Sequence, residues 1–272
     1  MRPRSRHRWR RKPATVVGAV LVCTLAGIGA ASVPSHAPPA PRASGAEASL
    51  PPPVTPDFVP GPPKRLGSTR YLSHWAAVQR TTPARSAPRS AAPVVAELER
   101  MTPEETRNVV AVLGRAQDGG GRTWVHVALP VLPNGTTGWV PRTALGGYET
   151  VRTLLDVDLE GLQATLYRNG RPLLKAPIGV GMRGWETPRG RFYVRNKLTR
   201  YESPTYGPVA FGTSARSPSA TDWPAGGYVG IHGTDAPALI PGRVSHGCIR
   251  LRNTDILELA RHMPVGTPVR IN

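Results

Sequence analysis

One of the two cysteines carries the reactive group that this sequence offers for chemistry. Cys248 ends the stretch Ser245–Cys248 (SHGC), and the pair His232–Gly233 precedes that stretch. A thiol attacks a carbonyl carbon only as the thiolate, and a cysteine near neutral pH is mostly protonated. A nearby imidazole can accept the proton, while backbone N–H groups can stabilise the negative charge that develops on the attacked oxygen. These residue types therefore predict a cysteine acyltransferase or hydrolase.

Two other interpretations of the same residues stay open. A cysteine is often a small buried apolar side chain, and a nearby histidine often has only a structural role. His232, His246 and Cys248 could also be three zinc ligands, although no CxxC or HxxxH spacing supports a zinc site. We therefore expect no metal and no cofactor.

The region that must position these residues, 148–272, is rich in strand patterns. Residues 162–167 and 173–180 flank the turn Asn169-Gly170 and predict a hairpin. Further strands are expected at 192–196, 209–212 and 265–271, and one helix at 255–263, capped by Thr254 or Asp255 and ended by Pro264. We predict a mainly β protein whose catalytic domain is a β-sandwich, preceded by a small β-barrel domain.

The residues around Cys248 and His232 closely resemble the signature of the L,D-transpeptidase (YkuD-type) catalytic domain. The resemblance rests on the segments 231–234 (IHGT), 245–251 (SHGCIRL), 187–192 (TPRGRF), 207–212 (GPVAFG) and 227–232 (GYVGIH). It covers about residues 151–272. Many members have asparagine at the position of Arg250 and others have arginine, so this departure concerns substrate positioning more than the core mechanism.

The resemblance implies a role for each histidine and for the cysteine. Cys248 is expected to be the nucleophile that forms a thioester with the acyl donor. His232 is expected to be the general base, and the acid that later serves the leaving amine. The backbone carbonyl of Gly233 is expected to orient the His232 imidazole. His246 is the rival base by proximity, and we expect it to be a supporting residue on the oxyanion side.

The remaining residues of the signature are expected to contact the substrate. The backbone N–H groups of Gly247 and Cys248 are candidates for the oxyanion hole, and Ser245 is expected beside them. Arg250 offers a fixed cation for a carboxylate of the peptide donor, with a structural or solvated arginine as the alternative. Tyr206, Tyr228 and Trp223 are candidate groove residues, and Asp235 and Asp222 are candidates to orient His232, although packing and surface turns are equally good explanations.

The resemblance also implies the reaction. Enzymes of this family cut the bond before the terminal D-alanine of a peptidoglycan tetrapeptide stem. They pass the acyl group to the side-chain amine of a neighbouring stem's diamino acid, giving a 3→3 cross-link. Two alternatives stay open: an L,D-carboxypeptidase that uses water as acceptor, and an inactive domain that tethers the protein to the wall. A poised thiolate, alkylated below the ordinary cysteine pKa, would favour an enzyme over a tether. The expected partners are stem peptides, and the sequence does not determine the oligomeric state.

The N-terminal residues 1–33 predict an export signal or a signal anchor. Residues 1–12 are rich in arginine and lack acids, and residues 13–31, which include Cys23, are almost wholly apolar or small. The apolar stretch is near the length that spans a bilayer, so contact with a membrane is expected only through this segment if it is not cleaved. We expect an exported protein of the cell wall or the outer face of the cytoplasmic membrane.

Two further regions separate this segment from the catalytic domain. Residues 34–65 are proline-rich and predict a disordered spacer. Residues 66–147 resemble a small Src-homology-3-like β-barrel, with strands at 109–113, 123–129 and 137–141, a turn at Asn134-Gly135 and a helical turn at 102–107. The net charge of +18 is explained either by attraction to anionic wall polymers or membrane surfaces, or by the arginine bias of a GC-rich genome. Nucleic acid is not expected, because the chain is exported and carries no nucleic-acid-binding motif.

Overall fold

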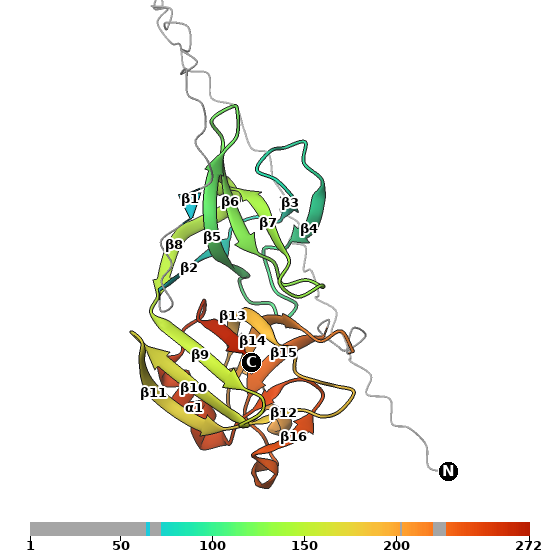
Figure 1. Ribbon diagram of the computed structural model, residues 1–272, viewed down its shortest axis with the longest axis vertical. Helices are drawn as coiled ribbons and strands as arrows, with labels where there is room; N and C mark the ends of the chain where they lie inside the picture. Colours follow the sequence, from blue (N-terminus) through green and yellow to red (C-terminus); the bar gives the residue numbers. More distant parts are fainter. Residues whose placement is uncertain (1–63, 66–71, 202, 220–226) are drawn as a thin grey trace, which may run out of the picture. The chain divides into compact units, whose positions relative to one another are not determined.

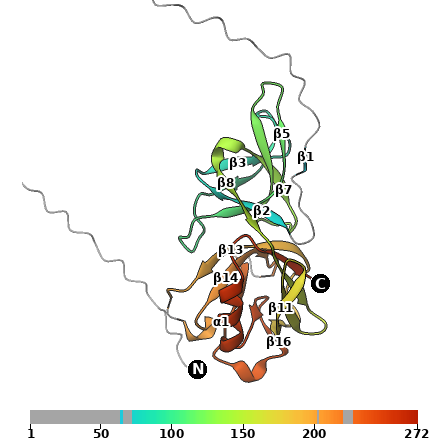
Figure 2. The ribbon, with the colours of Figure 1, turned by 90° about the vertical axis from the view of Figure 1, so that its left-hand side faces the viewer.

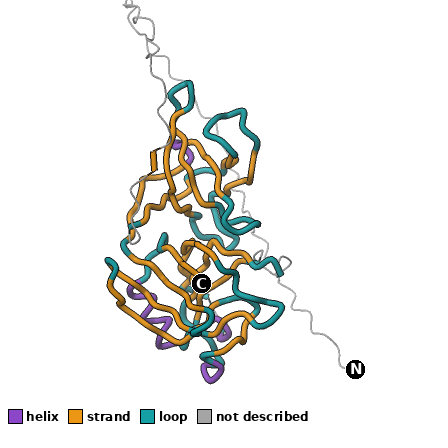
Figure 3. Tube along the Cα trace, in the orientation of Figure 1, coloured by secondary structure: helices purple, strands orange, loops and turns teal. Residues whose placement is uncertain are grey.

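The computed structural model describes residues 64–65, 72–201, 203–219 and 227–272 of the chain. The predicted export segment 1–33 and nearly all of the spacer 34–65 lie outside these residues. The described residues all belong to the structural unit Thr55–Asn272. Within them, no helix is both long enough and apolar enough to cross a membrane. Strands dominate, as the orange segments of Figure 3 show.

The first sheet is antiparallel and precedes the catalytic region in the chain (Figure 1). Its strand order is β4-β3-β7-β6-β5-β2-β8, and β1 also pairs with β5. The strands are β1 (Lys64–Arg65), β2 (Ser73–Val78), β3 (Thr82–Arg85), β4 (Val94–Leu98), β5 (Val109–Gln117), β6 (Thr123–Ala128), β7 (Thr137–Pro141) and β8 (Leu145–Val151). A short 3-10 helix, η1 (Arg142–Ala144), precedes β8. The strands expected at 109–113, 123–129 and 137–141 are confirmed as β5, β6 and β7.

The loop between β4 and β5 differs from the prediction. Residues 102–107 do not form a helical turn: Glu105 has a φ of +58°, in the left-handed region that ends a right-handed turn. An isolated bridge between Met101 and Arg107 closes the loop, and the side chains of Thr102 and Thr106 hydrogen bond inside it at 2.8 Å. The loop is therefore a compact irregular turn, which projects Glu104 away from its own sheet.

The second sheet is mixed and has ten strands, in the order β11-β10-β9-β18-β13-β14-β15-β17-β12-β16. The pairs β9–β18, β15–β17 and β12–β16 are parallel, and the other pairs are antiparallel. The strands are β9 (Thr153–Asp158), β10 (Gln163–Arg168), β11 (Arg171–Pro177), β12 (Gly179–Gly181), β13 (Gly190–Leu198), β14 (Ala210–Arg216), β15 (Tyr228–His232), β16 (Gly242–Ser245), β17 (Ile249–Arg250) and β18 (Pro268–Ile271). The 3-10 helices η2 (Pro204–Tyr206) and η3 (Pro237–Leu239) lie in its loops. The predicted hairpin at Asn169-Gly170 joins β10 to β11, and both turn residues have a positive φ.

The second sheet folds over on itself through the long strand β13. The first half of β13 pairs with β18, and the second half pairs with β14. One apolar cluster therefore contains residues from both halves, such as Val157 and Leu166 on one side and Phe211, Ile231 and Ile249 on the other. The predicted β-sandwich is confirmed in this form: the two layers are halves of a single curled sheet.

One α-helix, α1 (Asn253–His262), covers part of this core and packs beside β11 (Figure 2). Ile256 and Leu259 are its buried residues and belong to the same apolar cluster. The predicted helix is confirmed, but the predicted cap is wrong, because the N-cap residue is Arg252 and it makes no side-chain capping bond. Thr254 and Asp255 lie inside the first turn instead.

Candidate active site

The parallel pair β15 and β17 positions the predicted nucleophile and base. In their register Ile231 lies opposite Ile249, and His232 lies opposite Arg250. Successive side chains of a strand point to opposite faces. Ile231 and Ile249 are fully buried in the core, so His232, Arg250 and the residue just before β17, Cys248, face the other side.

Cys248 and His232 both lie next to Gly230. The amide of Gly230 donates a hydrogen bond to Cys248 Sγ at 3.3 Å. A Cβ at Gly230 would lie 3.7 Å from Cys248 Sγ and 3.6 Å from His232 Cδ2. The absence of a side chain at Gly230 therefore leaves open the space that both reactive groups border.

Burial keeps the thiol protonated at rest. It raises the pKa of Cys248, and the hydrogen bond from Gly230 and the positive charge of Arg250 offset only part of this effect. Alkylation of Cys248 below the ordinary cysteine pKa is therefore not expected for the resting site. The thiol must lose its proton as it attacks.

The imidazole of His232 is held as a neutral base. Its Nδ1 lies 2.6 Å from the backbone carbonyl oxygen of Gly233, which can only accept, so Nδ1 carries the proton and Nε2 has the free electron pair. Burial lowers the pKa of His232 to about 4; the bond to Gly233 opposes this and Arg250 adds to it. The Tyr206 ring packs against the imidazole with 4.6 Å between the ring centroids. At neutral pH the base is thus uncharged and ready to take a proton.

The Gly233 carbonyl is itself fixed by neighbouring backbone. The amide of Gly233 donates to the Val209 carbonyl at 3.3 Å, and the amide of Thr234 donates to Asn253 Oδ1 at 2.9 Å. Gly233 also packs directly against Asn253 and Gly207, which leaves no room for a Cβ. Only glycine fits here, and its carbonyl is therefore held in one position toward His232.

Hydrogen bonds from two buried side chains stabilise the turn before Cys248. Ser245 is fully buried, and its Oγ donates to the Cys248 carbonyl at 2.6 Å while it accepts the Gly247 amide at 3.1 Å. Thr187 Oγ1 donates to the Gly247 carbonyl and accepts the Gly181 amide, both at 2.9 Å. Gly247 has a φ of +110°, a conformation that favours glycine.

These bonds involve two residues that were predicted to contact the substrate, a prediction that stays untested. Ser245 does not face the cavity and instead braces the turn. The Gly247 N–H is occupied by Ser245 Oγ, so it is not open to an oxyanion in this conformation. The Cys248 N–H has no hydrogen-bond partner among the described residues and is the remaining candidate from the pair.

His246 and Arg250 both line the cavity beside Cys248. His246 is exposed and packs edge-on against Trp185, with 4.9 Å between the ring centroids. Arg250 is half-buried, and its Nε is buried without a hydrogen-bond partner among the described residues. The residues that the structure describes contain no cluster of metal-ligating side chains, at His232, His246 and Cys248 or elsewhere.

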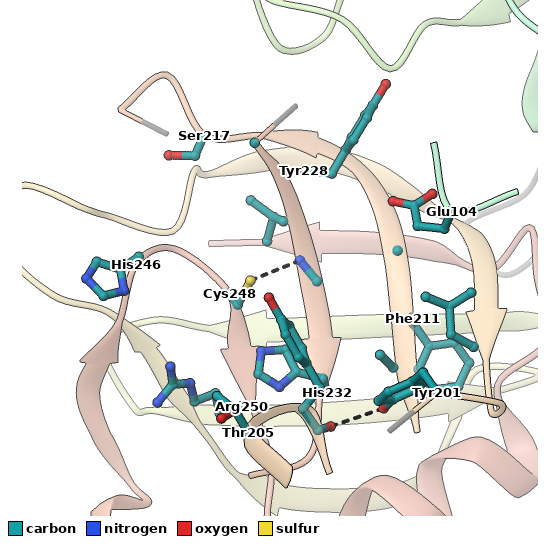
Figure 4. Close-up of a pocket in the computed structure, with 17 residues that line it drawn as sticks. Glu104, Tyr201, Thr205, Phe211, Ser217, Tyr228, His232, His246, Cys248 and Arg250 are labelled. Atoms are coloured by element: carbon teal, nitrogen blue, oxygen red, sulfur yellow. Dashed lines mark hydrogen bonds between the residues drawn. The ribbon is translucent and has the colours of Figure 1, made fainter. Parts of the chain in front are cut away.

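A cavity of about 430 Å³ opens over the reactive pair (Figure 4). Aromatic residues form much of its wall, including Tyr201, Tyr206, Phe211 and Tyr228. The Tyr201 hydroxyl donates to the Tyr206 carbonyl at 3.2 Å, which fixes one rim. An acyl chain bound here would be shielded from water beside Cys248.

Comparison with known proteins shows the family to which this domain belongs. The model of the L,D-transpeptidase catalytic domain, YkuD, matches residues 152–271. The YkuD protein of Bacillus subtilis is 40% identical over 123 residues, which cover 45% of this chain and 68% of that protein. The chain belongs to the YkuD family of L,D-transpeptidases.

Two further L,D-transpeptidases match different shares of their length. The ErfK/SrfK protein of Salmonella typhimurium is 37% identical over 169 residues, 54% of this chain and 52% of that protein. The solved catalytic domain of an Enterococcus faecium L,D-transpeptidase is 30% identical, with a TM-score of 0.35, and the match covers 44% of this chain and 96% of that one. The chain thus spans about half of the Salmonella relative and about two thirds of YkuD.

Sequence reasoning did not single out several residues of this L,D-transpeptidase cavity. Tyr206 and Tyr228 were candidates and do line it, whereas Asp235 is exposed and contacts Thr205 at 3.4 Å in place of His232. Trp223 and Asp222 lie outside the described residues. Ser217, whose buried Oγ has no partner among the described residues, and Glu104, from the first sheet, had no motif to mark them.

Proposed function

We propose that this protein is an exported L,D-transpeptidase that forms 3→3 peptidoglycan cross-links through a thioester on Cys248. One observation carries the proposal: a thiol and a neutral imidazole with a fixed tautomer share one face of paired strands and border one cavity. The family supplies the substrate class, peptidoglycan stem peptides. The roles of Cys248, His232, Gly233, His246 and Arg250 below remain predictions.

In the first half-reaction the Cys248 sulfur attacks the carbonyl carbon of the donor's third residue. His232 Nε2 takes the thiol proton during the attack, since burial disfavours both the free thiolate and the imidazolium. The Cys248 N–H, which has no partner among the described residues, would donate to the developing oxyanion. The bond to the terminal D-alanine then breaks, its nitrogen takes the proton from His232, and a thioester remains.

In the second half-reaction an amine of a neighbouring stem attacks the thioester. His232 takes a proton from that amine and returns it to the sulfur as the carbon–sulfur bond breaks. The product is a new amide, and the free thiol is restored. Water in place of the amine would give a carboxypeptidase, and the same residues would serve.

Arg250 is the group best placed to hold a donor carboxylate. It lies opposite His232 in the strand register and lines the cavity. Its Nε is a buried hydrogen-bond donor that has no partner among the described residues. His246, on the exposed rim, would support the loop or the leaving group rather than act as the base.

Residues 1–65 support a proposal on location. The basic and then apolar order of 1–33 would direct export, and the proline-rich spacer 34–65 would extend the enzyme toward the wall. The domain that follows would be a Src-homology-3-like wall-associated module. Fractionation of cells that express the tagged chain tests this, since recovery in the cytoplasm would contradict it.

The function is tested with the full-length chain and a disaccharide-tetrapeptide, with products read by mass spectrometry. We expect a cross-linked dimer and free D-alanine, both lost in Cys248→Ala. Cys23→Ala is the matched control and should keep both products, since Cys23 is the other cysteine. Tripeptide without dimer would favour the carboxypeptidase. Unchanged substrate, with no adduct on Cys248, would overturn the proposal and favour the alternative of an inactive domain that tethers the protein to the wall.

A further inference from the structure

A carboxylate from the first sheet reaches the active-site cavity. Glu104 lies in the loop between β4 and β5, yet it lines the same cavity as Cys248 and His232. The other residues that line the cavity lie between Leu198 and Arg250. Figure 4 shows the Glu104 side chain separated from Arg250, with the aromatic wall around the space.

The second sheet fixes this carboxylate by only one of its oxygens. Asn196 Nδ2 donates to Glu104 Oε2 at 3.0 Å, and Arg195 Nη2 lies 3.3 Å from the same oxygen. The other oxygen, Oε1, has no hydrogen-bond partner among the described residues. The side chain is 20% exposed, so Oε1 can accept a hydrogen bond from a molecule in the cavity.

Neighbouring contacts make this position stiff. Asn196 Nδ2 also lies 3.0 Å from Thr106 Oγ1, and its Oδ1 accepts the amide of Gly212 at 2.9 Å. Arg195 is only 1% exposed, and its guanidinium lies 3.7 Å from the centroid of the Tyr228 ring. A carboxylate held in this way loses little conformational entropy when it binds a ligand.

The charges of the cavity lining match a zwitterionic side chain. Among the described residues of the lining, Glu104 is the only carboxylate and Arg250 the only arginine or lysine, while most of the wall is aromatic or apolar. Apolar surroundings strengthen the interaction of each charge with an opposite charge on a ligand. A diamino acid whose side chain ends in both an ammonium and a carboxylate group presents this pair.

We propose that Glu104 binds the side-chain ammonium group of the donor's third residue, so that the first sheet supplies a specificity residue to the active site. The inference rests on the proposed function. In this arrangement Arg250 holds the carboxylate end of the same side chain, and the acyl carbon lies at Cys248.

The test compares two tetrapeptide donors in single-turnover acylation by the full-length enzyme, followed by D-alanine release. One donor has the ammonium group on its third residue, and the other has a methyl group in its place. For the wild type we expect a half-saturating concentration about tenfold lower for the ammonium donor, as for one partly exposed charge-assisted hydrogen bond, with a similar maximal rate. Glu104→Gln should remove this preference and leave the methyl donor unaffected.

Glu105→Gln is the matched control, because Glu105 is the neighbouring exposed acid on the same loop. It should keep the tenfold preference. An equal loss on both donors in Glu104→Gln would mean that Glu104 only neutralises Arg195, and would overturn the inference. If Glu104→Gln does not fold, Glu104→Gln with Arg195→Met removes both members of the buried pair and gives the same comparison.

The two proposals fail in different ways. A wild type that releases no D-alanine from either donor contradicts the proposed function itself. A wild type that releases D-alanine from both donors at equal half-saturating concentrations contradicts only the role of Glu104.

Discussion

The two sheets of this protein bury polar side chains to different extents. The main apolar cluster of the first sheet is aliphatic, with Trp124 also buried, and the buried polar residues of this region are Thr82, Thr102 and Asn108. The second sheet, with its loops, buries many more, and they include the following residues near the cavity: Thr187, Arg195, Asn196, Thr213, Ser217, His232, Thr234 and Ser245. Because a buried polar group costs free energy unless it is hydrogen bonded, such a concentration indicates a site that holds groups for chemistry.

This difference predicts that substitutions in the two sheets affect different properties, acylation in one and stability in the other. Changes in the polar framework of the second sheet should reduce acylation more than stability. Changes in the first sheet should do the reverse, with the loop that carries Glu104 as the exception. Substitutions in each sheet can test this division.

Substitution of the two histidines near Cys248 should give the largest difference in acylation rate. His232→Ala removes the base that Gly233 orients, and we expect acylation to fall by about 10²–10⁴-fold. His246→Ala should cost less than about tenfold, because His246 is exposed and packs against Trp185. Stopped-flow measurement of D-alanine release compares both variants, and the opposite ranking would make His246 the base.

Loss of the buried Thr187 hydroxyl should have the next largest effect on acylation, although this hydroxyl contacts only backbone. Thr187→Val keeps the shape of the side chain but leaves the Gly181 amide and the Gly247 carbonyl unpaired. We expect a loss of about 1–3 kcal/mol of stability and a fall in acylation of about tenfold, since the turn before Cys248 loosens. Thr187→Ser keeps the hydroxyl and is the control. Loss of stability with an unchanged acylation rate would separate this framework from the chemistry.

Arg250→Gln should change the pH dependence of the enzyme. Arg250 lowers the pKa of both His232 and Cys248, so its removal should raise both. In the wild type kcat/KM for the donor should decrease as the pH falls through about 4, where His232 becomes protonated and can no longer act as a base. In the variant this decrease should begin at a higher pH, and alkylation of Cys248 by iodoacetamide should also need a higher pH. Unchanged pH profiles would mean that Arg250 is too well solvated to influence the pair.

The parts of the fold that the sequence predicted are those that local chemistry determines. The hairpin at Asn169-Gly170 follows from two residues that tolerate a positive φ, and β7 follows as the strand that returns after the turn at Asn134-Gly135. The Cys248 and His232 pair was visible because a short, specific motif carries it. Only the register of β15 and β17, however, shows that both face the same side.

The parts that were missed depend on contacts between residues far apart in the chain. Asn196 holds Glu104 across 92 positions, and no local pattern marks either residue. The expected helical turn at 102–107 was wrong because Glu105 adopts a left-handed conformation, which closes the loop and turns Glu104 outward. Ser245 was assigned to the substrate because it belongs to the motif, but only the structure shows that its hydroxyl braces the turn.

The smallest expected effect lies in the turn between β5 and β6 of the first sheet. Asp118 accepts hydrogen bonds from Trp124 Nε1 at 2.9 Å, from the Arg122 amide at 3.0 Å and from the Gly120 amide at 3.1 Å. The bond from Trp124, more than any other cause, lowers the pKa of Asp118 below its ordinary value. A carboxylate with a lowered folded-state pKa adds stability above its unfolded pKa and loses that contribution as the pH falls through the folded value.

Asp118→Asn should therefore destabilise the protein at neutral pH by about 1 kcal/mol or less, because the turn is open to solvent and water screens the charge. The difference in unfolding midpoint from the wild type should shrink as the pH is lowered below the ordinary aspartate range. Acylation should be unchanged, and Glu97→Gln, an exposed acid on β4, should change neither quantity. Thermal unfolding at neutral and acidic pH, with D-alanine release at neutral pH, measures both. A slower acylation in Asp118→Asn would show that the first sheet influences the chemistry beyond the loop of Glu104, and the division between the sheets would then be too sharp.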